Sequence, residues 1–208
     1  MALGGSNIVL VLATRNEGKV QELKSLLADL PVALKSLKEF PDIPTLAEPG
    51  PTFAENALAK ARTVAGLTGL PTLADDSGLE VDALGGQPGV YSARYAGEGA
   101  SDAANNQKLL AALAGVPAGK RTARFRSAVV LTLPDGREFL FTGVCQGEVG
   151  FSPRGEDGFG YDPLFRVAGL DRTMAELSLE EKNSISHRAL ALTKMKEALR
   201  GLLEEYAG

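Results

Sequence analysis

The chain has 208 residues, 44% of which are hydrophobic, and its formal net charge at pH 7 is −4. This length and apolar content suffice for one sizeable core, so we expect a single domain over residues 1–208. The acidic balance and the lack of a long basic block argue against broad binding of nucleic acid through its phosphates, so no nucleic-acid partner is expected.

The sequence also gives expectations about location. No apolar run approaches the roughly 20 residues that a membrane-spanning helix needs, so we expect no membrane partner. Met1–Ser6 lacks the regions of a signal peptide, and its Gly4-Gly5 pair is given no role. One cysteine, Cys145, excludes an intrachain disulfide and favours a reducing cytoplasm. We interpret Cys145 as a packing residue in a strand; the alternative is a nucleophile, which needs a neighbouring histidine.

The first half of the chain begins with a continuous apolar run over residues 7–13, typical of a strand buried on both faces. Polar residues 14–19 follow, and a helix is then predicted to run until Pro31. Residues 41–51 hold four prolines and predict a loop. Thr52, with Glu55 three residues later, predicts a capping box at the start of a second helix. The expected buried faces are Val20, Leu23, Leu26, Leu27 and Leu30 in the first helix and Phe53, Ala57, Ala61 and Val64 in the second.

The second half begins with a short strand predicted to run into Asp75-Asp76. Ser101 or Asp102 is expected to cap a third helix that ends near Gly115. Residues 125–133 and 138–149 predict two strands joined by the hairpin turn Pro134-Asp135-Gly136, and 150–163 a glycine-rich loop. Strands and helices that alternate around a hairpin indicate an α/β fold with a mixed, twisted sheet flanked by helices. The last helix is expected to begin near residues 184–187, with the buried stripe Leu192, Met195, Leu199, Leu202 and Tyr206.

Four carboxylates lie within residues 75–82, and Asp75 and Asp76 are adjacent. Acids at the end of a strand, followed by Ser77-Gly78, are typical of a loop that holds Mg²⁺ against phosphate oxygens. Mg²⁺ usually binds one or two carboxylates together with the phosphates of a substrate. The alternative is a solvated acidic turn.

The pattern Thr14-x-Asn16-x-x-Lys19 lies where the first helix should begin. A helix N-terminus offers free N–H groups and a positive partial charge, which together favour phosphate. Because Lys19 opposes the helix dipole, we expect an anionic ligand beside it. The alternative is a capped helix with a surface lysine, since this is not a P-loop. In isolation, Glu48 and Lys60 are expected to be an exposed loop acid and an exposed helix lysine.

Glycines flank Phe159 in the loop Gly155–Pro163, which permits a flat ligand to approach the ring. Stacking on a nucleobase is worth about 1–3 kcal/mol. Asp162 could accept a hydrogen bond from a base or orient a donor. The alternative is a loop that Phe159 and Tyr161 anchor in the core.

Basic and polar side chains gather in residues 182–188, at the expected start of the last helix. They offer several donors to an acceptor-rich ligand. The alternative for His187 is a structural or surface histidine. No nucleophile elbow supports a Ser-His-Asp triad.

Six motifs in this order resemble the inosine triphosphate pyrophosphatase family, over about residues 8–200. The resemblance implies hydrolysis of ITP, dITP and XTP to the monophosphate and pyrophosphate, which clears deaminated purines. It also implies a Mg²⁺ requirement, an elongated two-lobed α/β fold with the active site between the lobes, and a homodimer. The motifs are Thr14-x-Asn16-x-x-Lys19-x-x-Glu22, Thr52-Phe53-x-Glu55-Asn56-Ala57, Asp75-Asp76-Ser77-Gly78-Leu79, Pro88-Gly89-Val90-Tyr91-Ser92-Ala93-Arg94, Phe159-Gly160-Tyr161-Asp162-Pro163 and Ser186-His187-Arg188.

The resemblance also implies residue roles. Asp76 and Glu48 are the implied Mg²⁺ ligands, and Asp76 is also the general base. Phe159 is implied to stack on the base, with Gly160 and Tyr161 beside it in the substrate site. The implied triphosphate ligands are Thr14, Arg15, Asn16, Glu17, Gly18 and Lys19, with Lys60 and Ser77 as further phosphate contacts. The implied base pocket consists of Asp162, Lys182, His187 and Arg188.

Other functions fit parts of the sequence. Stacking on Phe159 would also serve a pyrophosphatase for other modified nucleotides. A non-catalytic nucleotide-binding regulator would keep the phosphate cradle without acids poised at a metal. A dimerising scaffold would bind no nucleotide at all.

Overall fold

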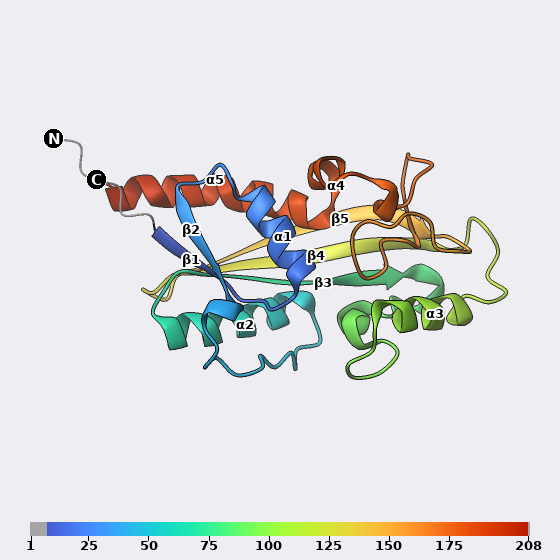
Figure 1. The fold of residues 1–208 in the computed structure, drawn as a ribbon, viewed down its shortest axis with the longest axis horizontal. Helices are drawn as coiled ribbons and strands as arrows, with labels where there is room; N and C mark the ends of the chain where they lie inside the picture. The colour runs from blue at the N-terminus through green and yellow to red at the C-terminus, as the bar shows by residue number, and fades with distance from the viewer. Residues whose placement is uncertain (1–7, 208) are drawn as a thin grey trace. The chain divides into compact units, whose positions relative to one another are not determined.

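The structure is a computed structural model that describes residues 8–207, and for residues 200–207 it describes the backbone alone. Asn7, the Met1–Ser6 segment and the side chains of Leu202 and Tyr206 lie outside the described residues. Figure 1 shows the fold. The elements are β1 (Ile8–Leu12), α1 (Glu17–Leu26), β2 (Val32–Ser36), η1 (Leu37–Glu39), α2 (Phe53–Thr68), β3 (Thr72–Val81), η2 (Asp82–Leu84), η3 (Gly89–Arg94), α3 (Asp102–Ala112), β4 (Thr122–Thr132), β5 (Glu138–Val149), β6 (Phe165–Val167), η4 (Met174–Glu176), α4 (Leu179–Ile185) and α5 (His187–Ala207), where η marks a short 3-10 helix.

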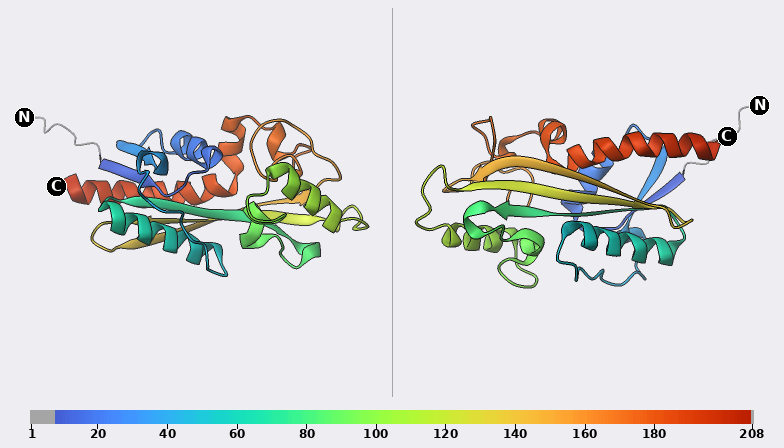
Figure 2. Two further views of the ribbon diagram at one scale, coloured as in Figure 1. Left: turned by 60° about the horizontal axis from the view of Figure 1, so that its bottom comes forward. Right: turned by 180° about the vertical axis from the view of Figure 1, so that it is seen from behind.

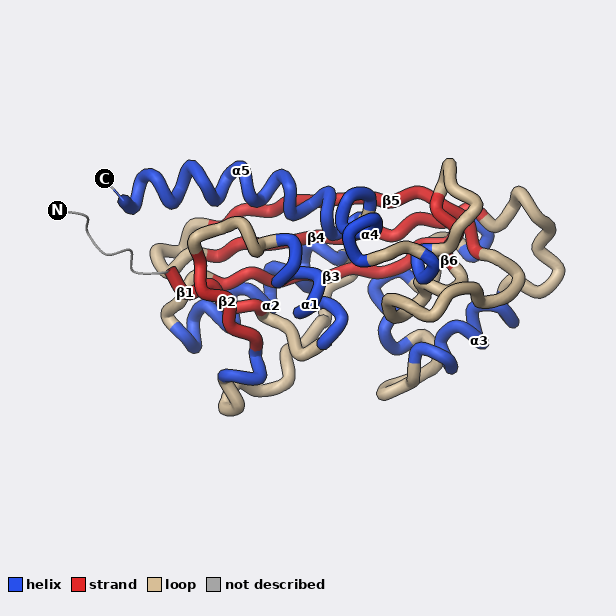
Figure 3. The backbone as a smooth tube through the Cα atoms, turned by 45° about the horizontal axis from the view of Figure 1, so that its top comes forward, coloured by secondary structure: helices blue, strands red, loops and turns tan. Residues whose placement is uncertain are grey.

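Within the described residues, six strands form one sheet in the order β2-β1-β3-β4-β5-β6. β1 is parallel to both β2 and β3, with Leu12 opposite Ser36 and Leu73, whereas β6 is antiparallel to β5. The sheet is therefore mixed, and β2 and β6 are its edge strands (Figure 3). The predicted α/β class with a mixed sheet and flanking helices is confirmed. The predicted placement of the active site between two lobes stays a prediction.

The chain divides into two compact units. The first unit consists of Met1–Asp75, Val129–Phe141 and Leu192–Gly208, and the second of Asp76–Ala128 and Thr142–Ala191. In the first unit, α2 lies on one side of the strands, and α1 and the later part of α5 lie on the other (Figure 2). The predicted faces of these helices are largely buried, because Leu23, Ala57 and Met195 have at most 1% of their surface exposed.

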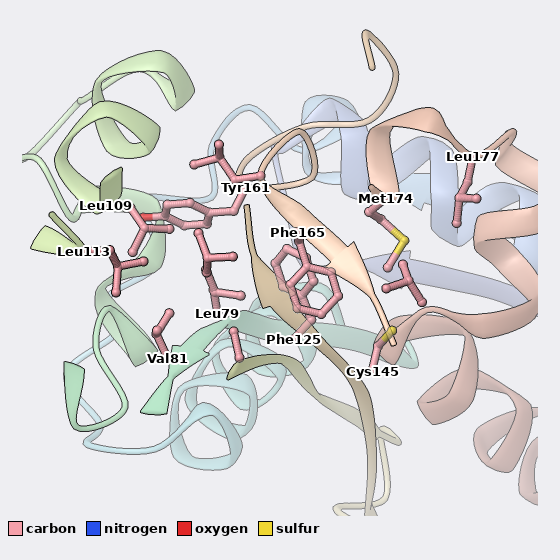
Figure 4. Packing of buried hydrophobic residues seen from close by; sticks show 14 residues of the cluster. Leu79, Val81, Leu109, Leu113, Phe125, Cys145, Tyr161, Phe165, Met174 and Leu177 are labelled. Atoms are coloured by element: carbon pink, nitrogen blue, oxygen red, sulfur yellow. The ribbon is translucent and has the colours of Figure 1, made fainter. Parts of the chain in front are cut away.

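The second unit has its own hydrophobic core (Figure 4). Phe125 from β4 and Phe165 from β6 pack with ring centroids 4.5 Å apart. Tyr161, from the glycine-rich loop, and Leu109, from α3, pack in the same cluster. The core therefore joins this loop to α3, β4 and β6.

Local sequence signals place several boundaries as predicted. The Thr52 side chain accepts a hydrogen bond from the Glu55 N–H, and the Glu55 carboxylate accepts one from Thr52, so the capping box is confirmed. Ser101, not Asp102, caps α3. The hairpin between β4 and β5 closes with a hydrogen bond from the Leu133 N–H to the Arg137 carbonyl, 2.9 Å long.

Other expectations were wrong. β2, β6 and α4 were not predicted; β2 is an edge strand that is mostly half-buried, so it lacks a clear apolar alternation. α1 ends at Leu26, before Pro31. The last helix, α5, begins at His187 as predicted, but residues 182–185 lie at the end of α4 and not at the start of α5. Within the described residues, no helix has the length and apolarity needed to cross a membrane.

Candidate active site

The start of α1, in the first unit, is a capped helix N-terminus. The Asn16 side-chain oxygen accepts a hydrogen bond from the Lys19 N–H at 3.0 Å, and the Thr14 hydroxyl accepts one from the Asn16 N–H at 3.1 Å. Glu17 and Gly18 follow in the first turn, where Glu17 forms an exposed ion pair with Lys38. Both polar side chains of the expected phosphate cradle therefore stabilise the helix end.

Arg15 connects this helix start to the proline-rich loop. Its guanidinium donates hydrogen bonds to the Ile43 carbonyl at 2.5 Å and to the Pro44 carbonyl at 3.4 Å. The loop continues to Glu48. Arg15 thus anchors the segment that carries one of the predicted metal ligands.

Four charged residues of the first unit form a cluster. The Lys19 ammonium lies 2.7 Å from the Asp75 carboxylate, and the Lys60 ammonium lies 2.7 Å from the Glu48 carboxylate. Lys60 also donates a 3.0 Å hydrogen bond to the Asp75 carbonyl. Only 6% of the surface of Lys60 is exposed, so its interpretation as an exposed helix lysine is wrong. Lys19 is not a surface lysine either, because it forms an ion pair with the buried Asp75.

The ion pair between Lys19 and Asp75 changes the interpretation of Lys19. Lys19 opposes the dipole of α1, and an anionic ligand was expected to compensate for it. The Asp75 carboxylate already supplies that negative charge. The position of Lys19 is therefore no evidence for a ligand by itself.

Asp76, Ser77 and Gly78 belong to the second unit and lie inside β3, not in a loop after a strand. The expectation of a loop at these acids is wrong. A Cβ atom on Gly78 would lie 2.4 Å from the Ser92 hydroxyl oxygen and 2.6 Å from the Gly89 carbonyl oxygen. Glycine is required here because η3 packs directly on the strand, not because the chain turns. Asp76 itself is buried, with 6% of its surface exposed.

The predicted base-binding residues of the second unit come together. The Lys182 ammonium lies 4.9 Å from the centroid of the Phe159 ring, and the Arg188 guanidinium carbon lies 5.7 Å from it. Lys182 also forms an ion pair with Asp162 at 2.5 Å, and Asp162 accepts a 3.0 Å hydrogen bond from the Phe159 N–H. Arg188 donates a 2.9 Å hydrogen bond to the Ser77 hydroxyl. The glycine-rich loop, α4, α5 and β3 thus contribute to one polar cluster.

The ring of His187, the only histidine in the sequence, packs against an aromatic side chain. Its ring stacks on Phe125 at 4.8 Å between centroids, with 16° between the planes. A Cβ atom on Gly143 would lie 2.0 Å from the His187 carbonyl oxygen. The glycine therefore lets β5 approach the first turn of α5 closely enough to fix His187 and Arg188.

Tyr161 is a core residue. Its hydroxyl donates a 2.9 Å hydrogen bond to the Ser92 carbonyl, and burial raises the pKa of this hydroxyl. Its ring therefore anchors the loop, as the alternative interpretation held, and a role of Tyr161 in substrate binding stays a prediction.

Gly160, beside it, is held by two residues of α3 that the sequence argument did not select, Asp102 and Asn106. A usable signal was present, because asparagine is unfavourable inside a helix and α3 contains Asn105-Asn106.

The carboxylates suit a hard cation, although they do not form a ready-made metal centre. Among the residues that the structure describes, no three His, Cys, Asp or Glu side chains group as metal ligands. Mg²⁺ commonly needs only one or two carboxylates, because phosphates and waters supply its other oxygen ligands. The carboxylate oxygens of Glu48 and Asp76 are ligands of the kind that Mg²⁺ binds.

Cys145, in β5, is buried. Burial and, to a lesser extent, the charge of Asp162 raise the pKa of its thiol to about 11. The thiol therefore stays protonated at neutral pH, which supports its interpretation as a packing residue.

Comparisons with known proteins agree with the predicted resemblance. A protein of Geobacter sulfurreducens named dITP/XTP pyrophosphatase is 57% identical over 190 residues, which cover 91% of this chain and 96% of that one. One of the same name from Symbiobacterium thermophilum is 55% identical over 196 residues, with 94% and 97% covered. The solved structure of a HAM1 protein from Coxiella burnetii has a TM-score of 0.84 and 44% identity, and covers 93% of this chain and 99% of its own. The model of the Ham1 family matches residues 10–198, and the chain therefore belongs to the Ham1 family.

Proposed function

We propose that this chain hydrolyses the triphosphates of deaminated purine nucleosides, dITP, XTP and ITP, to the monophosphate and pyrophosphate. The observation that carries the proposal is the 57% identity, over 91% of the chain, to a protein named dITP/XTP pyrophosphatase. The buried charged clusters of the two units support it, because each has the chemistry that one end of a nucleotide needs.

The first unit is proposed to bind the triphosphate. Lys19 and Lys60 each pair with a carboxylate, and both also contact the Asp75 carbonyl, at 3.4 and 3.0 Å. A phosphate oxygen can join these contacts without displacing the carboxylates, since a lysine ammonium has three donors. Residues 14–19 offer backbone N–H groups at the start of α1.

Glu48 and Asp76 are proposed to hold Mg²⁺, which when bound would neutralise phosphate charge. Asp76 is proposed to accept a proton from the water that attacks the α-phosphorus. The bond from this phosphorus to the oxygen bridging to the β-phosphorus then breaks, and pyrophosphate leaves. Asp76 is buried, with 6% of its surface exposed, so its carboxylate and the attacking water would be shielded from bulk solvent.

The second unit is proposed to bind the base. Phe159 would stack on the purine, and Lys182, His187 and Arg188 would supply donors to the 6-oxo group of hypoxanthine or xanthine. Adenine carries an amino group at that position and would leave such donors without an acceptor. A site built for a hydrogen-bonded group can reject the analogue that lacks it by a factor of about 10⁴ or more.

The test is an identification of products. The purified chain is incubated with dITP or XTP and Mg²⁺, and phosphorus NMR follows the products. We expect one pyrophosphate for each monophosphate formed. Release of orthophosphate with a diphosphate would contradict the proposal, because the bond broken would then lie between the β- and γ-phosphates.

We further propose a Mg²⁺ requirement, a homodimer and a cytoplasmic location. The family resemblance of the six motifs supports the first two. The single cysteine, whose thiol stays protonated, supports a reducing compartment. Loss of turnover in EDTA with recovery in Mg²⁺, and the mass in solution by light scattering, would test the first two.

A further inference from the structure

Two side chains of α3 bind the backbone N–H and the backbone carbonyl of Gly160. The Gly160 N–H donates a 2.6 Å hydrogen bond to the Asp102 carboxylate, and the Gly160 carbonyl accepts a 2.9 Å hydrogen bond from the Asn106 side-chain amide. Asp102 and Asn106 are four residues apart, so they lie on one face of the helix. Gly160 has a φ of 62°, a left-handed conformation that favours glycine.

Gly160 directly follows Phe159, the proposed stacking platform. On one side of Gly160, the Phe159 N–H is bound by Asp162. On the other side, Tyr161 is anchored in the core and bound to Ser92. The two hydrogen bonds from α3 fix the peptide units between these anchors. They therefore restrain the backbone that carries the Phe159 ring.

Helix stability does not explain Asn106 and explains Asp102 only in part, through its charge in the first turn. Ser101 caps α3, with its hydroxyl accepting from the Ala104 N–H at 3.2 Å, so Asp102 is not the capping residue. Asparagine has a poor helix propensity, and Asn106 lies in the helix interior. The hydrogen bond to Gly160 gives Asn106 a reason that helix stability does not, and it adds a second reason for Asp102.

We propose that Asp102 and Asn106 are positioning residues for base recognition. They hold Gly160 so that the Phe159 ring is already oriented before the nucleotide binds, which lowers the entropy lost on binding. This inference rests on the proposed function. It assigns α3 a role in affinity for the base and none in the attack on phosphorus.

The test measures binding of the base separately from binding of the phosphates. Asp102→Ala and Asn106→Ala are each expected to raise the KM for dITP about fivefold with kcat nearly unchanged, as expected for the loss of one hydrogen bond. The inhibition constant of inorganic tripolyphosphate, which has no base, should stay unchanged. Calorimetry with dIMP should show the same weakening as the KM.

Two further variants distinguish positioning from general destabilisation. Ser101→Ala removes the cap of α3 but no contact to Gly160, so it should lower the melting temperature and leave the KM for dITP unchanged. Asp102→Asn keeps an oxygen acceptor and should restore most of the affinity lost in Asp102→Ala. Thermal unfolding of every variant identifies any that fails to fold. If the alanine variants fail to fold, Asp102→Asn should still raise the KM for dITP above that of Ser101→Ala, because its acceptor is neutral and weaker; equal KM values would then overturn the inference.

The outcomes are distinct. An unchanged KM for dITP in the alanine variants, or an equal weakening of tripolyphosphate, would overturn the inference. A wild type that binds dIMP but does not hydrolyse dITP would overturn the proposed function alone, and the dIMP affinities would still judge α3. A wild type that does neither would overturn both.

Discussion

The buried carboxylate of Asp75 is stabilised by an oppositely charged partner. None of its side-chain surface is exposed, and Lys19 supplies the opposite charge at 2.7 Å. Removing one partner of such a pair leaves an uncompensated buried charge, which costs about 3–5 kcal/mol. Asp75 therefore contributes to the stability of the first unit as well as adjoining the proposed catalytic residue.

Lys19→Met is expected to lower the free energy of unfolding by about 3 kcal/mol, because it leaves Asp75 without this cation. Urea unfolding followed by circular dichroism measures it. Lys38→Met is the matched control, since its ion pair with Glu17 is exposed and should contribute less than about 1 kcal/mol. Equal effects of the two substitutions would show that the buried pair has no special weight.

Asp76→Asn is expected to lower kcat for dITP by a factor of about 10²–10⁴, because the amide cannot accept the proton of the attacking water. The melting temperature should change little, since asparagine has nearly the same shape. Steady-state kinetics measures the first and calorimetry the second. Asp82→Asn, in the exposed end of the same acidic run, is the control and should retain activity. Full activity of Asp76→Asn would exclude the proposed base.

Cys145 gives a pH prediction. Burial raises its thiol pKa from 9.0 to about 11, so the folded state holds its proton more tightly than the unfolded chain does. Its contribution to stability is present below pH 9 and is lost as the pH rises toward 11. We expect Cys145→Ser to flatten the decline of the unfolding free energy over that range. Iodoacetamide should label Cys145 slowly in the native protein at pH 8 and rapidly in urea; fast native labelling would contradict the burial.

At the scale of elements, sequence patterns correctly predicted features that depend on residues close together in the chain. The capping box at Thr52 and the hairpin turn at Pro134–Gly136 are short-range signals, and both were placed correctly. β2 and β6 were missed because edge strands of five and three residues gain their structure from a neighbouring strand. α4 was missed although Ser178 and Glu181 form a capping box, because its seven residues are too few to show a helical period.

The same difference between short-range and long-range contacts applies to the candidate site. The family resemblance assigned Lys19, Lys60 and Arg188 to substrate binding, and that role stays a prediction. The structure shows that Lys60 and Arg188 are buried and that Lys19 pairs with the buried Asp75. The partners of these residues depend on contacts across many positions, such as Arg188 with Ser77, 111 residues apart. No local pattern encodes such a pairing. The role of α3 was hidden for the same reason, since Asn106 and Gly160 are 54 residues apart.

The packing of β5 against α5 provides a test at this scale. A Cβ atom on Gly143 would lie 2.0 Å from the His187 carbonyl oxygen, so Gly143→Ala must displace the first turn of α5. We expect a loss of about 1–3 kcal/mol in stability and a higher KM for dITP. Gly66→Ala is the control, because nothing lies within 4 Å of its Cβ position in α2, and it should stabilise by about 0.5–1 kcal/mol. Stability that is unchanged in Gly143→Ala would refute the close approach.

At the scale of the whole molecule, the proposed functions fall in different units. The lysines proposed for the triphosphate belong to the first unit, and the donors proposed for the base belong to the second. The peptide bond between Asp75 and Asp76 passes from one unit to the other. Asp75 and Asp76 therefore do not form a single metal-binding turn, because the two aspartates belong to different units.

The central claim is that the chain distinguishes deaminated purines from adenine by their 6-oxo group. The most direct measurement is kcat/KM for dITP and for dATP under the same conditions with Mg²⁺, because these substrates differ only at the 6-position of the base and in the proton on N1. We predict a ratio of about 10² or more in favour of dITP, with pyrophosphate as the product. Equal values for the two nucleotides would contradict the account, because donors aimed at the 6-oxo group could not then determine the substrate.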